Sequence, residues 1–134
     1  MNLELPSEKY KKSYLEAVKE FLEKGEYLER EHLKIGLESD FSEHIQSIRD
    51  KINIEKVKEG KVPETIYWLI DNEEFIGKIN IRHELNDRLK ESGGNIGYKI
   101  RPSKRNMGYG SKILELVLPK AKELGIDNAL LYLS

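Results

Sequence analysis

The sequence predicts an α/β (α+β) domain in which a mixed, mainly antiparallel sheet is flanked by helices. Three observations support this. Apolar residues recur at helical spacing in the first part of the chain, β-branched and aromatic residues dominate after Pro63, and a helix-spaced segment lies between two further strand-like runs. The 134 residues suit a single domain, with a helical part over 1–62 and a sheet part over 63–134.

Composition narrows the classes of function. Lys and Arg number 23 and Asp and Glu 24, for a net charge of −1, so a general nucleic-acid or membrane-surface binder with a basic excess is not expected. The chain has no Cys, which excludes disulfides, thiolate metal sites and cysteine nucleophiles. No apolar run reaches membrane-spanning length, and the first residues lack a signal-peptide pattern, so we expect a cytoplasmic protein.

Two helices are expected in the first part of the chain. Ser7 suits the N-cap of the first helix, and Gly25 suits its end because glycine enters the left-handed conformation without steric cost. Between them apolar residues recur at helical spacing, namely Tyr10, Tyr14, Leu15, Val18, Phe21 and Leu22. The second helix is expected to begin at Asp40. Its apolar face would consist of Phe41, Ile45, Ile48 and Ile52.

A β-hairpin is expected after the helical part. Residues 65–70 are β-branched and aromatic, with a tryptophan that we expect to be packed, and residues 71–74 form a turn. Residues 75–82 then alternate, so that Ile79 and Ile81 share one face of the strand and polar side chains occupy the other.

A strand–helix–strand unit follows the hairpin. A polar loop over 83–94 leads to a third strand from about 95 to 101, which Pro102 ends. Residues 111–124 have helical spacing, and 128–133 read as a buried strand. The apolar side of this last helix would consist of Ile113, Leu114, Val117 and Leu118.

The most informative stretch connects the third strand to the helix that follows it. Gly108 and Gly110 stand where this helix begins, and free N–H groups at a helix start on a glycine-rich turn form an anion site. Between Asn95 and Lys112 there are five basic residues and no acidic one, which predicts a local positive field. A P-loop is excluded because Ser111 precedes the lysine, and a dinucleotide fingerprint because its third glycine is missing.

A longer pattern surrounds these glycines. The run Arg105-Asn106-Met107-Gly108-Tyr109-Gly110 spells R-x-x-G-x-G. Together with the preceding Gly97-Tyr98-Lys99-Ile100-Arg101-Pro102, it resembles the acetyl-CoA-binding motif of the GNAT acetyltransferase superfamily. The resemblance covers about residues 66–133. Within the superfamily, the runs at 81–86 and 93–98 look like those of a bacterial subgroup of predicted acetyltransferases without an assigned substrate.

The resemblance implies a role for each residue that matches the motif. Backbone N–H groups from Arg105 to Gly110 (Arg105, Asn106, Met107, Gly108, Tyr109 and Gly110), with the Ser111 hydroxyl, would hold the pyrophosphate of acetyl-CoA. The backbone of Ile100 and Arg101 would pair with the pantetheine arm, and an N–H group there would polarise the acetyl carbonyl. A primary amine of a small molecule or peptide would then attack the thioester directly.

The attacking amine must first lose a proton, so a general base is needed. Glu84 and His83 lie at the end of the second hairpin strand, on the expected acceptor side, and both remain candidates. His32 and His44 are expected at the surface, and no pair of histidines has metal-ligand spacing, so no metal is expected.

The chain departs from the family at its last residue, Ser134, because such domains usually continue with a helix and two strands. We therefore expect a domain truncated after the strand that follows the CoA-binding helix, or one completed by a second copy in a homodimer. The alternative to an N-acetyltransferase is a non-catalytic acyl-CoA-binding or interaction module that keeps the cofactor half of the fold.

Overall fold

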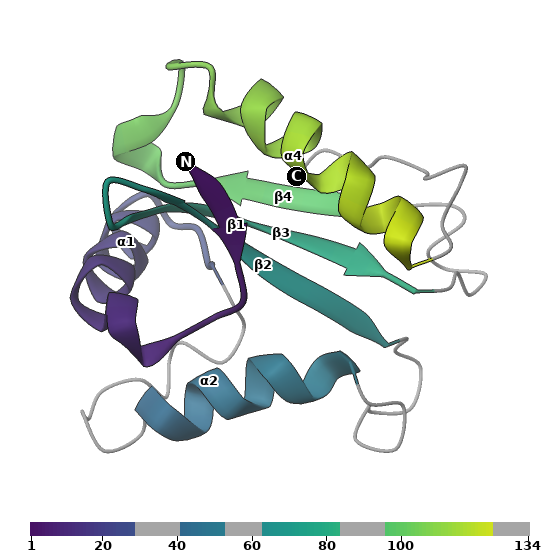
Figure 1. Cartoon of the computed structure of the whole chain (residues 1–134). Helices are drawn as coiled ribbons and strands as arrows, with labels where there is room; N and C mark the ends of the chain where they lie inside the picture. The colour runs from purple at the N-terminus through teal and green to yellow at the C-terminus, as the bar shows by residue number, and fades with distance from the viewer. Residues whose placement is uncertain (29–40, 53–62, 84–95, 125–134) are drawn as a thin grey trace.

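The computed structural model of the chain describes residues 1–28, 41–52, 63–83 and 96–124 (Figure 1). In these residues a four-stranded antiparallel sheet, ordered β1-β2-β3-β4, is flanked by three α-helices, as the predicted fold class requires. The strands are β1 (Asn2–Glu4), β2 (Glu64–Asp71), β3 (Glu74–Arg82) and β4 (Ile96–Ile100). The helices are α1 (Lys11–Glu23), α2 (Phe41–Arg49) and α4 (Tyr109–Glu123), with 3₁₀ turns η1 (Glu8–Tyr10), η4 (Asp50–Ile52) and η6 (Pro102–Lys104).

The predicted hairpin is confirmed. β2 and β3 pair antiparallel from Glu64 opposite Arg82 to Asp71 opposite Glu74. Two residues join the strands, and both have positive φ, as in a type I′ turn: Asn72 at 51° and Glu73 at 63°. The third predicted strand is also present as β4, which pairs with β3 on the side away from β2.

The first strand was not predicted. β1 adds three residues to the edge of β2, with Leu3 opposite Leu69. A segment of three residues is too short to show a period of two, so the pattern of the sequence carried no signal for it. These residues form a strand because they pair with β2, which lies more than sixty residues later in the chain.

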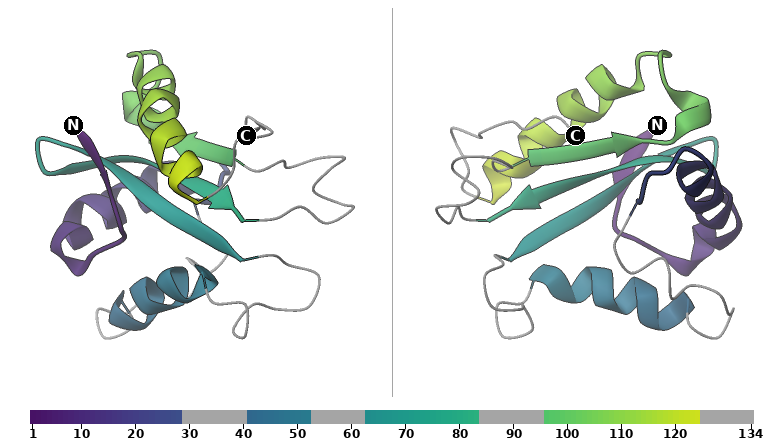
Figure 2. Two further views of the ribbon diagram at one scale, coloured as in Figure 1. Left: turned by 45° about the vertical axis from the view of Figure 1, so that its right-hand side comes forward. Right: turned by 180° about the vertical axis from the view of Figure 1, so that it is seen from behind.

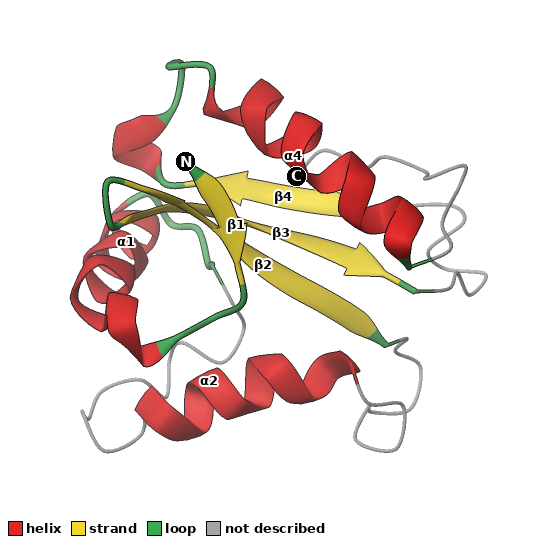
Figure 3. Ribbon diagram, in the orientation of Figure 1, coloured by secondary structure: helices red, strands yellow, loops and turns green. Residues whose placement is uncertain are grey.

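The sheet has helices on both faces, as Figures 2 and 3 show by the positions of α1 and α2 on one side and α4 on the other. One cluster of buried side chains lies between the sheet and the first two helices, and it includes Tyr14, Phe21, Phe41, Trp68 and Phe75. The second lies under α4, and it includes Leu69, Ile79, Ile81, Ile113 and Val117. Alternation along β2 and β3 divides the apolar residues between these two clusters.

Four of the six apolar residues predicted for the first helix are buried and Leu15 is partly buried, whereas three apolar expectations in the three helices are wrong. Tyr14 and Phe21 are fully buried, and the Tyr14 ring stacks on Trp68 at 4.5 Å. The exposed residues are Leu22, Ile52 and Leu118, at 43%, 51% and 51% exposure. Leu22 and Leu118 each follow a buried neighbour by one position, which turns them about 100° away from the core. Ile52 lies in η4, whose tighter winding moves it off the apolar face of α2.

The expectation of a surface histidine at position 44 is also wrong. His44 is only 6% exposed, and its Nε2 lies 2.9 Å from the Tyr14 hydroxyl. Its charge-rich sequence neighbours suggested solvent, but the helical register turns the ring toward α1. Asp40, His32, Glu84 and the expected strand over 128–133 lie outside the described residues.

Candidate functional site

The connection from β4 to α4 reverses the chain through two residues in the left-handed region. The 3₁₀ turn η6 follows β4, Arg105 is extended, and Asn106 and Gly108 have φ of +62° and +86°. Gly108 is the N-cap of α4, so the helix begins at Tyr109. We call residues 105–111 the anion turn.

The anion turn presents backbone donors. The first bond of the helical ladder runs from the N–H group of Lys112 to the Gly108 carbonyl, at 3.2 Å. The N–H groups of Tyr109, Gly110 and Ser111 therefore have no intrahelical acceptor, and they stand at the positive end of a helix of 15 residues. This is the arrangement that binds phosphate or carboxylate in many proteins.

The two glycines of the anion turn serve different purposes. A β-carbon placed on Gly108 would meet no atom within 4 Å, so the turn is open there and a ligand can approach the backbone. A β-carbon on Gly110 would come within 3.1 Å of the Tyr98 hydroxyl, so the absence of a side chain at this position lets the Tyr98 ring from β4 pack close to the backbone. The open surface at Gly108 and the free N–H groups after it fit a diphosphate.

Among the described residues β4 is the last strand of the sheet, and its edge on the side away from β3, the outer edge, is the second feature of the site. The Arg101 N–H group donates to the Ile76 carbonyl at 2.8 Å, so it points toward β3. Backbone groups of successive residues in an antiparallel pair point to opposite sides, so the N–H group of Ile100 points to the edge that faces away from β3. The Ile100 carbonyl accepts a bond from Nε of Arg105 at 3.0 Å.

The predicted role of Arg101 stays a prediction, and three contacts of this residue bear on it. Its N–H group bonds within the sheet, and its side chain is only 10% exposed. The guanidinium donates to Glu20 through Nε at 2.6 Å and lies 3.6 Å from Glu16. Arg101 thus joins the end of β4 to α1, and Ile100 is the residue of the pair whose backbone faces the edge.

The positive charge of the acid-free stretch is partly compensated, because four of its five basic residues lie near carboxylates. Three of the five lie near carboxylates from other elements, with shortest distances of 2.6 Å for Arg101–Glu20, 3.3 Å for Lys104–Glu74 and 2.7 Å for Arg105–Glu26. Lys112 lies 3.5 Å from Glu115 on its own helix, and Lys99 donates to the Tyr27 carbonyl at 2.6 Å. Backbone donors and the helix dipole therefore add to the attraction that these partly compensated basic side chains exert on an anion.

The carboxylates beside the anion turn have lowered pKa values. The hydrogen bond from Arg105 lowers the pKa of Glu26 and, in return, raises the pKa of Arg105. Burial by itself would raise the pKa of Glu20, but hydrogen bonds from Ser103 and Arg101 together outweigh it, so the net shift is downward. Both carboxylates are thus held in their charged form.

Sequence reasoning missed a contact at the start of α4. The Tyr109 hydroxyl donates to Asp71 Oδ2 at 2.9 Å, which ties the anion turn to the turn between β2 and β3. The hydrogen bond to Asp71, together with burial and the carboxylate charge, raises the pKa of Tyr109. No local pattern links these residues, which lie 38 positions apart in the chain.

His83 lies at the other end of the sheet from the anion turn. Its N–H group donates to the Pro63 carbonyl at 2.9 Å, and its ring Nε2 lies 2.7 Å from the Thr65 hydroxyl. It follows the end of β3, where Ile81 pairs with Ile96, the first residue of β4. His83 and the anion turn are therefore separated by about the length of β4.

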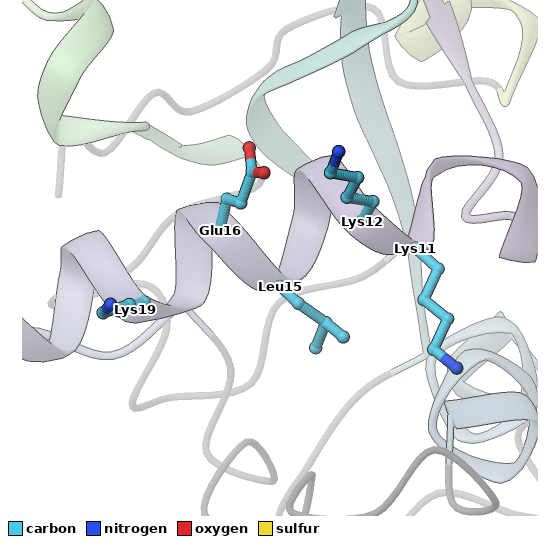
Figure 4. Close-up of a pocket in the computed structure, with 5 residues that line it drawn as sticks. All are labelled: Lys11, Lys12, Leu15, Glu16 and Lys19. Atoms are coloured by element: carbon cyan, nitrogen blue, oxygen red, sulfur yellow. The ribbon is translucent and has the colours of Figure 1, made fainter.

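A hollow of about 530 Å³ lies beside α1, and it is lined by Lys11, Lys12, Leu15, Glu16 and Lys19. Figure 4 shows these side chains pointing in different directions around the helix, so they do not converge on one ligand. No residue of the anion turn lines it. Within the described ranges no three His, Asp or Glu side chains are grouped to hold a metal ion, and no helix is long and apolar enough to cross a membrane.

Comparison with known protein families gives a match whose range includes this turn. No curated protein and no solved structure matches the chain. The model of the acetyltransferase (GNAT) family does match, over residues 17–134, a range that contains most of α1, the hairpin, β4, the anion turn and α4. This match spans most of the sequence, and the chain therefore belongs to the acetyltransferase (GNAT) family.

Proposed function

We propose that the chain is an acetyl-CoA-dependent N-acetyltransferase that transfers an acetyl group to a primary amine. Membership of the GNAT family supports acetyl transfer from acetyl-CoA to a small-molecule or protein amine in general terms. The observation that carries the proposal is the start of α4, where three N–H groups without helical acceptors follow Gly108 on an open surface.

The proposed binding mode follows from the two features of the site. The N–H groups of Tyr109 and Gly110, with the N–H group and hydroxyl of Ser111, would hold the diphosphate of CoA. The pantetheine arm would run along the outer edge of β4 as an added strand, with its amides near the backbone of Ile100. From the anion turn, this direction leads the thioester toward Ile96 and the end of β3.

The chemistry requires two contributions from the chain. A backbone N–H group at the β4 edge would donate to the carbonyl oxygen of the thioester as negative charge develops there, a contribution of about 3–4 kcal/mol when the donor is well placed. A base must also take the proton of the attacking ammonium, because only the neutral amine has a free electron pair. His83 and Glu84 remain the proposed candidates, since His83 follows β3 at the end toward which the arm would run.

The diphosphate assignment is tested by Gly108→Glu. We expect it to abolish CoA binding in calorimetry, because the new carboxylate would stand where the phosphates approach. It should leave the fold intact, since the β-carbon meets no atom within 4 Å, apart from about 1 kcal/mol of strain at φ +86°.

The matched control is Gly108→Asn, because asparagine tolerates a left-handed backbone and adds no charge. It should fold as well as the glutamate variant and keep a larger part of the CoA affinity. Unchanged affinity in Gly108→Glu would show that the diphosphate binds elsewhere.

The base is tested by Glu84→Gln and His83→Gln, with a panel of primary amines and acetyl-CoA. Loss of the base should lower turnover by about 10² or more and remove the pH dependence of kcat, while CoA binding in calorimetry stays unchanged. If both variants keep full turnover across the pH range, neither residue is the base. CoA binding without turnover in the unaltered chain would instead support the non-catalytic acyl-CoA-binding module.

A further inference from the structure

We propose that Glu26 and Arg105 form a splint that sets the shape of the anion turn, so that Arg105 positions the backbone and does not itself bind the phosphates. Arg105 is the arginine of R-x-x-G-x-G, where a basic side chain next to a diphosphate site suggests a direct phosphate ligand. The inference rests on the proposed function, because it assigns roles at the same site.

The contacts of the Arg105 side chain carry the proposal. Its two terminal nitrogens donate to the two oxygens of Glu26, at 3.0 and 2.7 Å, in the bidentate geometry that suits this pair of groups. Its Nε donates to the Ile100 carbonyl at 3.0 Å, so all three guanidinium nitrogens have acceptors. The guanidinium also lies over the Phe21 ring, 5.6 Å from its centroid.

These contacts join three parts of the fold at the first residue of the anion turn. Ile100 ends β4, Phe21 belongs to α1, and Glu26 follows α1. Arg105 is therefore held just before Asn106, whose φ of +62° begins the reversal into α4. The hydrogen-bonded lowering of the Glu26 pKa agrees with a carboxylate that stays charged toward this arginine.

A second carboxylate supports the same segment two residues earlier. Glu20 accepts a hydrogen bond from the Ser103 N–H group at 2.9 Å and another from Arg101 at 2.6 Å. The approach to the anion turn is thus attached at successive points to α1 and to the segment just after it, and the pair of Glu26 and Arg105 is the last of these attachments. A phosphate ligand at Arg105 would require the side chain to leave both Glu26 and the Ile100 carbonyl.

The two roles predict opposite effects of Glu26→Gln. If Arg105 were a phosphate ligand, removal of the competing carboxylate would release it, and CoA affinity would stay the same or rise. If the pair is a splint, the turn loses its support and CoA affinity falls, by about threefold to tenfold for a half-exposed charged pair. Calorimetry with CoA separates these outcomes, and a rise or no change overturns the proposal.

The matched control is Glu23→Gln, the same chemical change in the last turn of α1 at an exposed glutamate. It should leave CoA affinity unchanged. Acetyl-pantetheine lacks the diphosphate, so its KM should be unaltered in Glu26→Gln, whereas a general loss of structure would raise it. The reversed pair Glu26→Arg with Arg105→Glu should recover part of the affinity lost by Arg105→Glu alone, and no recovery counts against the splint.

The splint can also be measured without CoA, which separates its failure from that of the proposed function. In the unliganded protein, Glu26→Gln should speed amide hydrogen exchange at the hydrogen-bonded N–H groups at the two ends of the anion turn, those of Arg105 and Lys112, and leave exchange in β2 unchanged. Unaltered exchange in the anion turn overturns the splint, whether or not the unaltered chain binds CoA. If the unaltered chain does not bind CoA but exchange is faster in the variant, the splint is supported and the proposed function is wrong.

Discussion

Among the residues that the structure describes, three non-glycine residues have a left-handed backbone, and their identities indicate where the fold carries strain. Asn72 and Asn106 accept this conformation readily, because asparagine is among the few residues that visit it. Glu73 has φ of +63° at the second central position of the hairpin turn, where glycine is preferred. The turn residues of the hairpin are therefore suited to their geometry at one position and strained at the other.

Replacement of this glutamate gives a test at the residue scale. Glu73 is exposed, so Glu73→Gly removes the strain without disturbing a buried contact, and we expect the free energy of unfolding to rise by about 1 kcal/mol. Urea denaturation measures the change. Asn72→Gly is the control, and its free energy of unfolding should rise by less. A lower midpoint for Glu73→Gly would mean that the flexibility added to the unfolded chain outweighs the strain.

At the scale of elements, α1 does more than cover the sheet. Its polar face carries Glu16 and Glu20, which lie beside Arg101, and the Ser13 hydroxyl accepts a hydrogen bond from the Phe75 N–H group. A lysine- and glutamate-rich helix face usually indicates only solvent contact. In this fold the same face holds the end of β4 and the approach to the anion turn.

The lowered pKa values of Glu20 and Glu26 predict an acid-sensitive contribution to stability. Because the folded protein binds these protons more weakly than the unfolded chain does, the contribution is complete above the unfolded value of about 4.3 and is lost as the pH falls through the lower folded values. Thermal unfolding between pH 7 and 3 should therefore show a midpoint that declines below about pH 4.3.

Glu20→Gln tests the origin of this decline. We expect the variant to lose about 1–2 kcal/mol at pH 7 and to show a shallower fall of the midpoint in acid. The exposed Glu23→Gln should change neither quantity. An equally steep decline in Glu20→Gln would assign the acid sensitivity to other carboxylates.

At the scale of the whole molecule, one sheet separates two clusters of buried side chains. Trp68, the only tryptophan, is 1% exposed on the face toward α1, and Val117 is fully buried under α4. Because β2 and β3 contribute residues to both faces, disruption of one cluster also disturbs the strands on which the other cluster packs. We therefore expect the two faces to unfold together.

Val117→Ala tests this coupling. Removal of two buried methyl groups should lower the free energy of unfolding by about 2 kcal/mol. The unfolding midpoint measured by Trp68 fluorescence should fall together with the midpoint measured by far-UV circular dichroism, although the mutation lies on the opposite face of the sheet. Separate midpoints for the two signals would show that the faces unfold independently.

Most of the elements and the position of the anion turn could be predicted from the sequence, because they depend on patterns within a few residues. The spacing of apolar residues predicts the hairpin and α4, and the R-x-x-G-x-G run identifies the turn between β4 and α4. The backbone at Gly108 is open, whereas a β-carbon on Gly110 would lie 3.1 Å from the Tyr98 hydroxyl, a close approach that no local pattern indicates.

The sequence by itself thus determined α1, α2, the hairpin, β4 and α4, and it placed a glycine-rich turn at the start of α4. Tertiary structure alone decided which charges are neutralised: Arg105 meets Glu26 across 79 positions, and Arg101 meets Glu20 across 81. It also made β1 a strand and buried His44. The physical reason is the distance along the chain over which each interaction acts. Helical and strand periods are set by neighbouring residues. Ion pairs, edge strands and burial instead depend on which distant segments pack together.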